Sequence, residues 1–363
     1  VLQQQLGVTL VQAGFLLSMV QLAGMTLGLA VGLGADSLGL RRTMLTGLGL
    51  LAVASGLGGF AENIGGLLAL RALEGLGFLL VVMPAPAMIR RTVDVAQLNG
   101  RMGWWGTYMP LGSAAALLLG PMVLMHFQWQ VWWWALGAVS ALAWLALWWW
   151  VPAQGPALPV ASGSGWTQRL GLTLRSPGPW LVALCFMVYA SQWTAVIGFL
   201  PTVYAQAGLT SGMVGVLTAL VALANVSGNI MSGRLLQRGW RAEHLLQIGF
   251  GCMALGAVGA FMQWHGQGLP LPLRFVSVVL FSAVGGLIPG TLFASAVRLS
   301  PSEGTVSTTV GYMQQWSAFG QFAGPPLVAW VAAGTGGWQW TWVVTVALCG
   351  AGGLLAQRIG KAA

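Results

Sequence analysis

Long apolar runs alternate with short polar connections along almost the whole chain. A helix needs about 20 mainly apolar residues to cross a bilayer, and eleven runs approach or exceed this length. They cover approximately residues 13–35, 43–60, 65–89, 102–125, 131–151, 179–200, 212–236, 245–262, 273–297, 305–332 and 338–357. The pattern therefore predicts an all-α integral membrane protein with eleven spans in this chain.

Composition and charge agree with a membrane protein. Of the 363 residues, 57% are hydrophobic and only 6% are charged, against roughly a quarter charged in soluble domains. The net charge of +9 would suit a nucleic-acid partner in a soluble chain. Here the basic residues lie in short loops between apolar runs, where they set the orientation in the membrane. We therefore expect a lipid bilayer around the protein and no nucleic acid.

The basic residues also predict which ends of the spans face the cytoplasm. With the connection Gly32–Arg42 placed inside and the sides alternating, the inside segments hold 13 of the 15 basic residues, as the positive-inside rule requires. These are Arg41, Arg42, Arg90, Arg91, Arg101, Arg169, Arg175, Arg234, Arg238, Arg241, Arg298, Arg358 and Lys361. This orientation places the carboxyl end in the cytoplasm and leaves Arg71 and Arg274 within spans.

The chain repeats itself at about half its length, which is typical of transporters built from two related halves. Shifts of 201 and 204 align Gly7, Thr9, Gly14 and Gly32 with Gly208, Thr210, Gly215 and Gly233, and Gly100, Tyr108, Gly120 and Pro121 with Gly304, Tyr312, Gly324 and Pro325. The repeat predicts a first half at residues 1–151, a Pro/Gly/Ser-rich linker at 152–178 and a second half at 179–363. The second half has six spans and the first has five, so we expect a further helix before Val1.

Arg71 and Glu74 are charged residues inside a predicted span. They lie three residues apart on one helix face, and ionisable residues within spans usually face a partner or a water-filled cavity. Arg71 is therefore a candidate for binding an anionic or polar substrate, and Glu74 for tuning it or carrying a proton. The alternative is a structural ion pair. Arg274 corresponds to Arg71 by a shift of 203, and a second arginine favours small anions, whereas its place near the outer edge favours an interfacial role.

Two predicted spans share the sequence Tyr-x-x-Gln-Trp. The two sets are Tyr189, Gln192 and Trp193, and Tyr312, Gln315 and Trp316. Residues at i, i+3 and i+4 share one helix face, and an amide between aromatic rings suits a central binding pocket. Further polar residues within spans are Gln21, Tyr108, Asn225 and Asn229. Such amides also join neighbouring helices without any ligand, and both interpretations stay open.

Catalytic and metal-binding patterns are missing from the sequence. Cys185, Cys252 and Cys349 lie within apolar runs and lack ligand spacing. No phosphate-binding GxxxxGK(S/T) loop is present. We therefore expect no enzyme, no metal site and no cofactor.

The first polar connection reads Gly32-x-x-x-Asp36-x-x-Gly39-x-Arg41-Arg42. This motif resembles the loop between helices 2 and 3 of the major facilitator superfamily of membrane transporters. Ser37 and Leu40 stand where the family form usually has basic residues. The resemblance implies that this loop latches the two halves of the transporter during gating. For Asp36 we expect either water or a cation partner, Arg41, Arg90 or Arg91, because a carboxylate near a helix carboxyl end opposes the macrodipole.

A second motif is similar to helix 4 of the same superfamily. It reads Arg71-x-x-Glu74-Gly75-x-Gly77, with Glu74 in place of the usual Gln. The family's arginine is associated with proton coupling, so the resemblance implies a proton-coupling role near Glu74. Within the superfamily, VVMPAPAMIRR at residues 81–91 and the Trp-rich run at 129–134 are similar to the bacterial cyanate permease and nitroimidazole transporter group.

The resemblance implies two pseudo-symmetric six-helix bundles that open to either side of the membrane in turn. We expect a monomeric secondary transporter of a small polar or anionic solute in the bacterial inner membrane, with proton coupling as a hypothesis. One alternative is proton-driven efflux of drugs or lipophilic compounds, which the aromatic-rich spans favour. An alternative of another class is a membrane receptor or scaffold that transports nothing.

Overall fold

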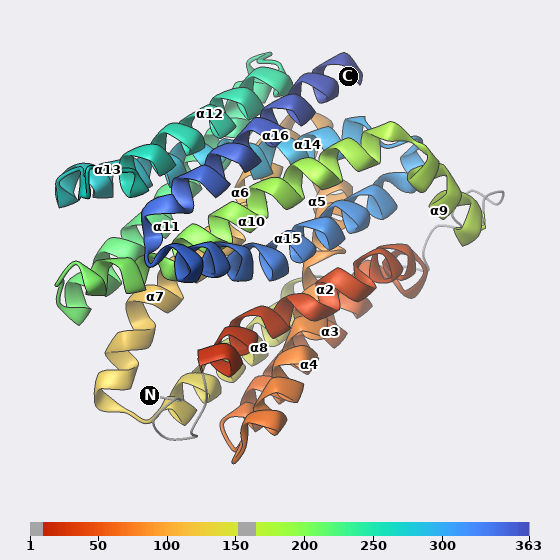
Figure 1. Cartoon of the computed structure of the whole chain (residues 1–363). Coiled ribbons are helices and arrows are strands. Elements are labelled where there is room, and N and C mark those ends of the chain that lie inside the picture. Colours follow the sequence, from red (N-terminus) through yellow and green to blue (C-terminus); the bar gives the residue numbers. More distant parts are fainter. Residues whose placement is uncertain (1–9, 152–164, 363) are drawn as a thin grey trace.

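The described structure consists mostly of long helices. The computed structural model describes residues 10–151 and 165–362, and at residues 10–15, 17, 32–38, 95–96, 99 and 211 it describes the backbone alone. The helices lie side by side in two groups, one below the other in Figure 1. The predicted all-α class is therefore confirmed.

The first group contains the helices that precede the linker. They are α2 (Leu10–Leu38), α3 (Leu40–Gly58), α4 (Ile64–Val82), α5 (Ala85–Thr92), α6 (Val95–Trp105), α7 (Tyr108–His126) and α8 (Trp129–Trp150). The predicted spans between residues 13 and 151 are all helical, and the span at 65–89 and the one at 102–125 each consist of two helices.

The second group follows the linker and is the more compactly packed. After α9 (Trp166–Arg175), its helices are α10 (Pro177–Gln206), α11 (Ser211–Gln237), α12 (Ala242–Phe261), α13 (Leu271–Gly285), α14 (Leu287–Arg298), α15 (Val306–Thr335) and α16 (Thr341–Ala362). The short 3₁₀ helices η1 (Glu303–Thr305) and η2 (Trp338–Trp340) precede α15 and α16. Eight helical segments of the described chain are long and apolar enough to cross a membrane.

Local sequence explains where several helices end. Gly39 separates α2 from α3 with a φ of 89°, in the left-handed region that glycine adopts without a steric penalty. The predicted turn of residues 32–42 is thus confined to this residue, because helical backbone continues to Leu38. Asn63 caps α4 by accepting a hydrogen bond from the Gly66 amide at 2.8 Å. A small hairpin of β1 (Gln263–Trp264) and β2 (Gln267–Gly268), not expected from the sequence, joins α12 to α13.

Two helix breaks occupy equivalent places in the two groups. α4 ends and α5 begins around Pro84 and Pro86, and α13 gives way to α14 at Gly286, just before Pro289. Pro86 and Pro289 are 203 residues apart, the same shift that relates Arg71 to Arg274. Proline removes a backbone donor and crowds the preceding turn, so the repeated proline accounts for the repeated break.

Glycine brings neighbouring helices into close contact in the second group. A side chain at Gly228 of α11 would collide with the Ala283 carbonyl of α13, and side chains at Gly320 and Gly324 of α15 would collide with backbone carbonyls of α10. Small residues allow such close packing between helices in membranes. α10 lies inside this group and buries most of its length.

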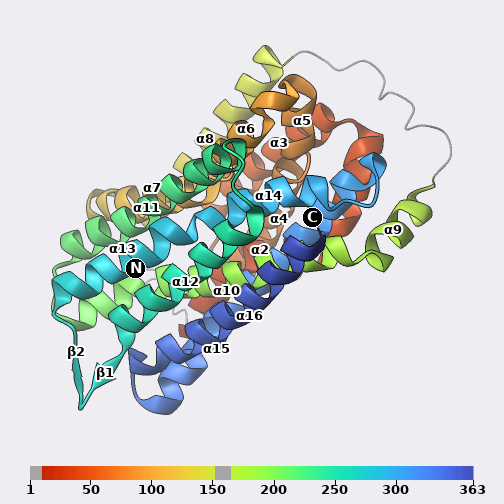
Figure 2. The same cartoon turned by 90° about the horizontal axis from the view of Figure 1, so that it is seen from above.

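The two groups meet mainly where α2 packs against one helix of the second group and where α6 and α7 pack against another. α2 packs against α15, where side chains at Gly24 and Gly28 would collide with Ala318 and Gln315. α6 and α7 pack against α11, with Gly103 and Gly106 lying against Asn229. The view from above in Figure 2 places α7 beside α11, in agreement with this contact.

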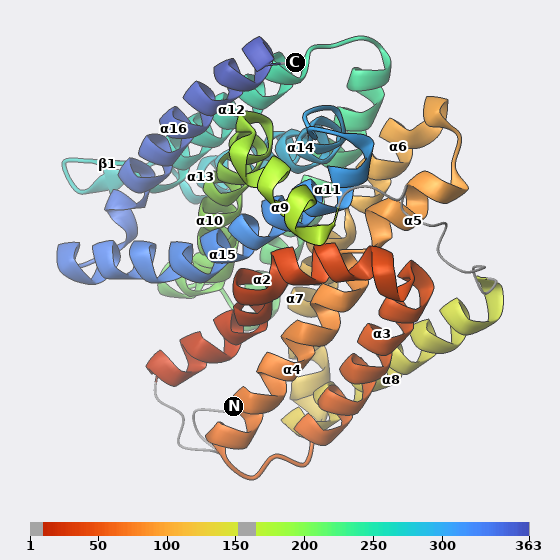
Figure 3. The same ribbon diagram turned by 90° about the vertical axis from the view of Figure 1, so that its right-hand side faces the viewer.

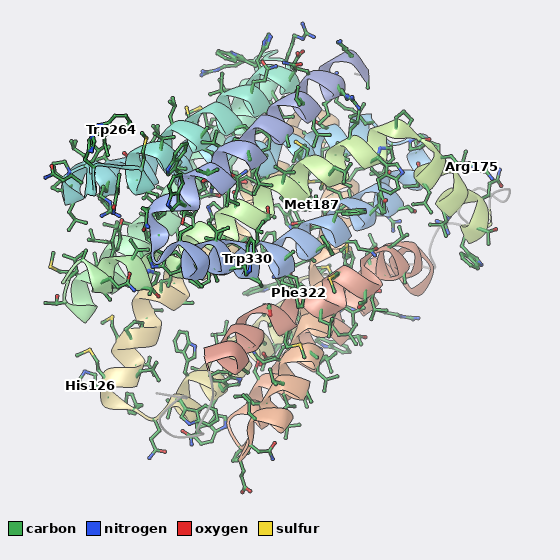
Figure 4. All side chains as sticks on the ribbon, in the orientation of Figure 1. His126, Arg175, Met187, Trp264, Phe322 and Trp330 are labelled. Atoms are coloured by element: carbon green, nitrogen blue, oxygen red, sulfur yellow. The ribbon has the colours of Figure 1, made fainter. Side chains whose placement is uncertain are left out.

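The molecule has two chemically different ends. Arg175 of α9 lies at one end in Figure 4, and His126 and Trp264 lie at the opposite end. The turn between α2 and α3 lies at the same end as α9 (Figure 1). We call this end the basic side.

Within the predicted linker 152–178, α9 is a helix that the sequence analysis did not anticipate. Figure 3 shows α9 in front of α10 and α15, where the two groups meet.

Candidate functional site

A row of six aromatic rings crosses from the first group of helices to the second. Centroid distances join Phe78 to Tyr108 at 6.0 Å, Tyr108 to Trp105 at 5.0 Å, Trp105 to Phe293 at 4.5 Å, Phe293 to Phe186 at 5.4 Å and Phe186 to Tyr189 at 6.1 Å. These spacings are typical of attractive ring contacts. This aromatic row draws on α4, α6, α7, α10 and α14, so it lies at the boundary that the two groups share.

Tyr108 also connects the groups through a hydrogen bond. Its hydroxyl pairs with the side chain of Gln314 on α15. The sequence analysis selected Tyr108 but chose the neighbouring Gln315 and missed Gln314. The spacing of Gln314, Ser317 and Gln321 would have identified it, because these positions form one polar stripe on the helix. In the structure Gln321 of this stripe donates to Ser317 at 3.2 Å and accepts from Gln21 at 3.0 Å.

At the far end of the aromatic row, Tyr189 joins a buried network of neutral groups. Asn225 donates to the Tyr189 hydroxyl at 3.0 Å and to the Ser282 carbonyl at 2.7 Å. Asn229 donates to the Asn225 carboxamide oxygen at 2.9 Å. Trp193 donates to the Ser282 hydroxyl at 3.3 Å. Tyr189, Trp193 and Asn225, all selected from the sequence, therefore lie together where α10, α11 and α13 meet.

Gln192 and the second aromatic–amide set contact other elements. Gln192 is fully buried and accepts from the Cys349 thiol of α16 at 3.2 Å. Gln315 accepts from the Leu29 amide of α2 at 3.0 Å. Tyr312 and Trp316 pack around Trp180, at centroid distances of 5.0 and 5.8 Å. The two sets thus face different neighbours, and substrate binding by these residues stays a prediction.

Arg71 and Glu74 form a charged centre within the first group. Arg71 forms an ion pair with Glu74, whose other oxygen accepts from the Ser55 hydroxyl at 2.6 Å. The Arg71 guanidinium also donates to the Leu16 carbonyl at 3.3 Å and lies 5.6 Å from the ring centroid of Trp133. Trp133 is buried, although its sequence neighbourhood resembles an interfacial belt. These contacts come from α2, α3 and α8, so both charged residues have protein partners.

Arg274, the counterpart of Arg71, has a simpler partner. Its Nε donates to the Ala260 carbonyl at 2.7 Å. Ala260 lies one residue before the end of α12, where a cation is favoured by the helix dipole. A role for Arg274 in substrate binding stays a prediction.

The turn after α2 contributes Arg41 to the basic side. Arg41 donates to the Trp148 carbonyl near the end of α8 at 2.8 Å and lies 5.2 Å from the Trp148 ring centroid. Arg42 is exposed. The side chain of Asp36 lies outside the described residues, as do the surroundings of Gly32, so the gating role of this loop stays a prediction.

A cavity of about 350 Å³ lies between the two groups on the basic side. Its lining is formed by Met83, Pro86, Ala87, Arg90, Arg91 and Met102 of the first group, Arg169 of α9, and Phe293, Val297, Glu303, Gly304, Val306, Ser307 and Val310 of the second group. Phe293 also belongs to the aromatic row. The sequence analysis placed the arginines at the cytoplasmic ends of spans but did not predict that they share a cavity.

One ion pair crosses this cavity from one group to the other. An Arg90 guanidinium nitrogen lies 3.8 Å from a Glu303 carboxylate oxygen, and the side chains are 38% and 94% exposed. Exposed pairs contribute about 0–1 kcal/mol, so this contact is easily exchanged for another. Among the described residues, no group of three or more His, Cys, Asp or Glu side chains could hold a metal ion.

Comparison with known proteins identifies the family. The family model described as Major Facilitator Superfamily matches residues 1–319 and, in a second match, residues 182–360. The chain belongs to the Major Facilitator Superfamily. Members of this superfamily are membrane transporters and not enzymes, so the family resemblance, the fold class and the non-enzymatic assignment made from the sequence are confirmed.

Individual relatives differ in what their names say they carry. The cyanate transport protein CynX of Escherichia coli (strain K12) is 25% identical over 266 residues, which cover 72% of this chain and 64% of that protein. The tetracycline resistance determinant of Streptomyces rimosus is 29% identical over 209 residues, covering 55% of this chain and 57% of that protein. The chain thus spans less than two thirds of the length of each of these relatives.

Solved structures of the superfamily share the fold. The human organic anion transporter MFSD10 matches with a TM-score of 0.77 and 18% identity over 95% of this chain and 83% of that one. The fucose:proton symporter FucP of E. coli matches with a TM-score of 0.73 and 15% identity over 96% of this chain and 91% of that one. At these identities the likeness concerns the fold alone.

Proposed function

We propose that the protein, acting as a monomer, moves a small polar or anionic solute across the bacterial inner membrane by alternating access. The observation that carries the proposal is the cavity between the two groups of helices, whose charged lining consists of three arginines and one glutamate. A net positive, partly enclosed site attracts anions. By the positive-inside rule we assign the basic side, and with it the carboxyl end, to the cytoplasm.

The packing between the groups supports a rocking movement. Small residues form the close contacts between the groups. Glycines of α2 pack against α15, and Gly103 and Gly106 pack against Asn229. In the proposed cycle the two groups rotate about the aromatic row. The weak ion pair between Arg90 and Glu303 re-forms or separates as the cytoplasmic side closes or opens.

Flux in proteoliposomes tests the proposal. We expect saturable uptake of ¹⁴C-cyanate, a probe taken from the cyanate transporter to which the chain is similar, and none in protein-free liposomes. Tyr108→Phe removes the hydrogen bond to Gln314 across the boundary, and we expect a roughly fivefold slower uptake from the loss of about 1 kcal/mol. Tyr204→Phe is the matched control, because the buried Tyr204 hydroxyl has no hydrogen-bond partner among the described residues. Absence of any anion flux would refute the proposal.

Drug efflux is the second candidate function. The aromatic row and the apolar part of the cavity favour it, as does similarity to the tetracycline resistance determinant. Export of the lipophilic cation tetraphenylphosphonium, without any cyanate flux, would select this function. Absence of flux for both probes would instead favour the receptor or scaffold.

We further propose Glu74 as the proton-coupling group. It is 3% exposed and lies within a membrane-spanning segment. Its carboxylate contacts Arg71, and the positive charge of Arg71 attracts an anionic solute. Glu74→Gln keeps the shape and the hydrogen-bonding capacity of the side chain but cannot carry a proton. We expect cyanate uptake by this variant to be independent of an imposed pH gradient. If the gradient still drives uptake, Glu74 does not couple protons.

A further inference from the structure

The cavity on the basic side combines a charged part with an apolar part. Arg90, Arg91 and Glu303 are exposed, whereas Met83, Met102 and Phe293 are buried. These three exposed charged residues therefore lie at the mouth, and the buried apolar residues lie deeper, toward the aromatic row. A bare inorganic anion would contact the first part and leave the second unused.

The volume also exceeds the needs of a triatomic anion. About 350 Å³ falls at the lower end of the 300–1,000 Å³ that is typical of pockets for organic ligands. Apolar walls with a few charged groups at one end are the usual composition of such pockets. The cavity matches an organic molecule with an acidic group at one end.

Arg169 adds a positive charge from outside both groups. It belongs to α9, is 8% exposed and lines the same cavity as the two arginines of α5. A guanidinium keeps its charge at any pH that the protein meets, and Coulomb attraction is stronger in a partly enclosed site than in water. Arginine also matches the planar geometry of a carboxylate.

From these observations we propose that the cavity binds an organic carboxylate. The acidic group binds to Arg91 and to Arg169 of the linker helix, and the apolar body lies against Met102 and Phe293. Arg90 exchanges its weak contact with Glu303 for the ligand. The inference rests on the proposed function in one respect, the anionic nature of the solute, and it assigns a binding role to α9.

Equilibrium binding to the purified full chain in detergent tests the site. The probes are ¹⁴C-benzoate, ¹⁴C-formate, which has the carboxylate without the apolar body, and ¹⁴C-benzamide, which has nearly the shape of benzoate without its charge. We expect benzoate to bind at least tenfold more tightly than either of the others. Formate binding as tightly as benzoate would overturn the apolar part of the proposal, and benzamide binding as tightly would overturn the charged part.

Variants locate the carboxylate. Arg169→Gln and Arg91→Gln are each expected to weaken benzoate binding at least tenfold, since each removes a charge-assisted hydrogen bond to the carboxylate, and to leave benzamide binding unchanged. Arg175→Gln is the matched control, because Arg175 is exposed on the same helix and does not line the cavity. If Arg175→Gln weakened benzoate binding equally, the affinity would depend on the overall positive charge of the basic side and not on the cavity, and the proposed site would be wrong. Arg91 is exposed, so its variant also tests the site if Arg169→Gln fails to fold.

Failure of the site and failure of transport are distinguishable. Binding is measured without a membrane, so specific benzoate binding with no flux in proteoliposomes would uphold the site and refute transport. Cyanate flux in the absence of benzoate binding would refute the site and leave the proposed transport standing.

Discussion

The two groups of helices bury their polar side chains in different ways. The first holds an ion pair, Arg71 with Glu74, to which the Ser55 hydroxyl donates. The second holds a neutral network centred on Asn225. A buried ion pair leaves an uncompensated charge when one partner is lost, whereas a neutral network loses its hydrogen bonds singly. The first group is therefore the more sensitive to substitution, and it is also the one that contains a buried acid.

Arg71 and Arg274, which occupy equivalent positions in the repeat, show the same difference between the two groups. Arg71 meets a carboxylate within the first group, and Arg274 meets the backbone carbonyl of Ala260. The residue type and its place in the repeat are the same, but its partner differs. Equivalence in a repeat therefore predicts the fold around a residue better than it predicts the residue's role.

The largest expected effect comes from breaking the ion pair. Arg71→Met retains the length and the apolar contacts of the side chain but leaves Glu74 buried without its cation. We expect a loss of about 3–5 kcal/mol of stability. The measurement is the free energy of unfolding in detergent, followed by circular dichroism during denaturant titration.

Arg274→Met provides the matched control for this variant. It removes a hydrogen bond between a cation and a helix carbonyl, so the expected loss is about 1.5 kcal/mol, near the lower end for bonds to charged groups. If the two variants lost equal stability, the ion pair of the first group would be no more important for folding than the neutral contact of Arg274 with a backbone carbonyl.

The architecture could be predicted from the sequence because bilayer spans are long and apolar. Every predicted span is helical, and two of them break beside Pro86 and Pro289. α9 was missed because it is only ten residues long and mixes polar with apolar residues, so it lacks the long apolar run that identifies a span. The Pro/Gly/Ser-rich residues that precede α9 indicated only an irregular linker between the two halves.

The site was less predictable, because the sequence does not reveal which face of a span meets which neighbour. Tyr108, Tyr189 and Asn225 were selected as candidates for substrate binding, which stays a prediction, and the sequence did not reveal the side chains that they contact. Phe293 and Phe186 carry no signal that distinguishes them from the other phenylalanines of the spans. Arg90, Arg91 and Arg169 were interpreted as topology signals, and only folding brings them to one cavity.

The neutral network provides the smaller test of the comparison. Asn225→Leu fills a similar volume but removes the donors to Tyr189 and to the Ser282 carbonyl. Leaving these groups unpaired should lower the free energy of unfolding by about 1–3 kcal/mol, less than Arg71→Met does. Ser227→Ala on the same helix is the control, because within the described part of the chain the exposed Ser227 hydroxyl bonds only to the nearby Ala224 carbonyl, and it should leave stability unchanged. If Asn225→Leu destabilised the protein more than Arg71→Met, the network and not the ion pair would be the centre on which packing depends.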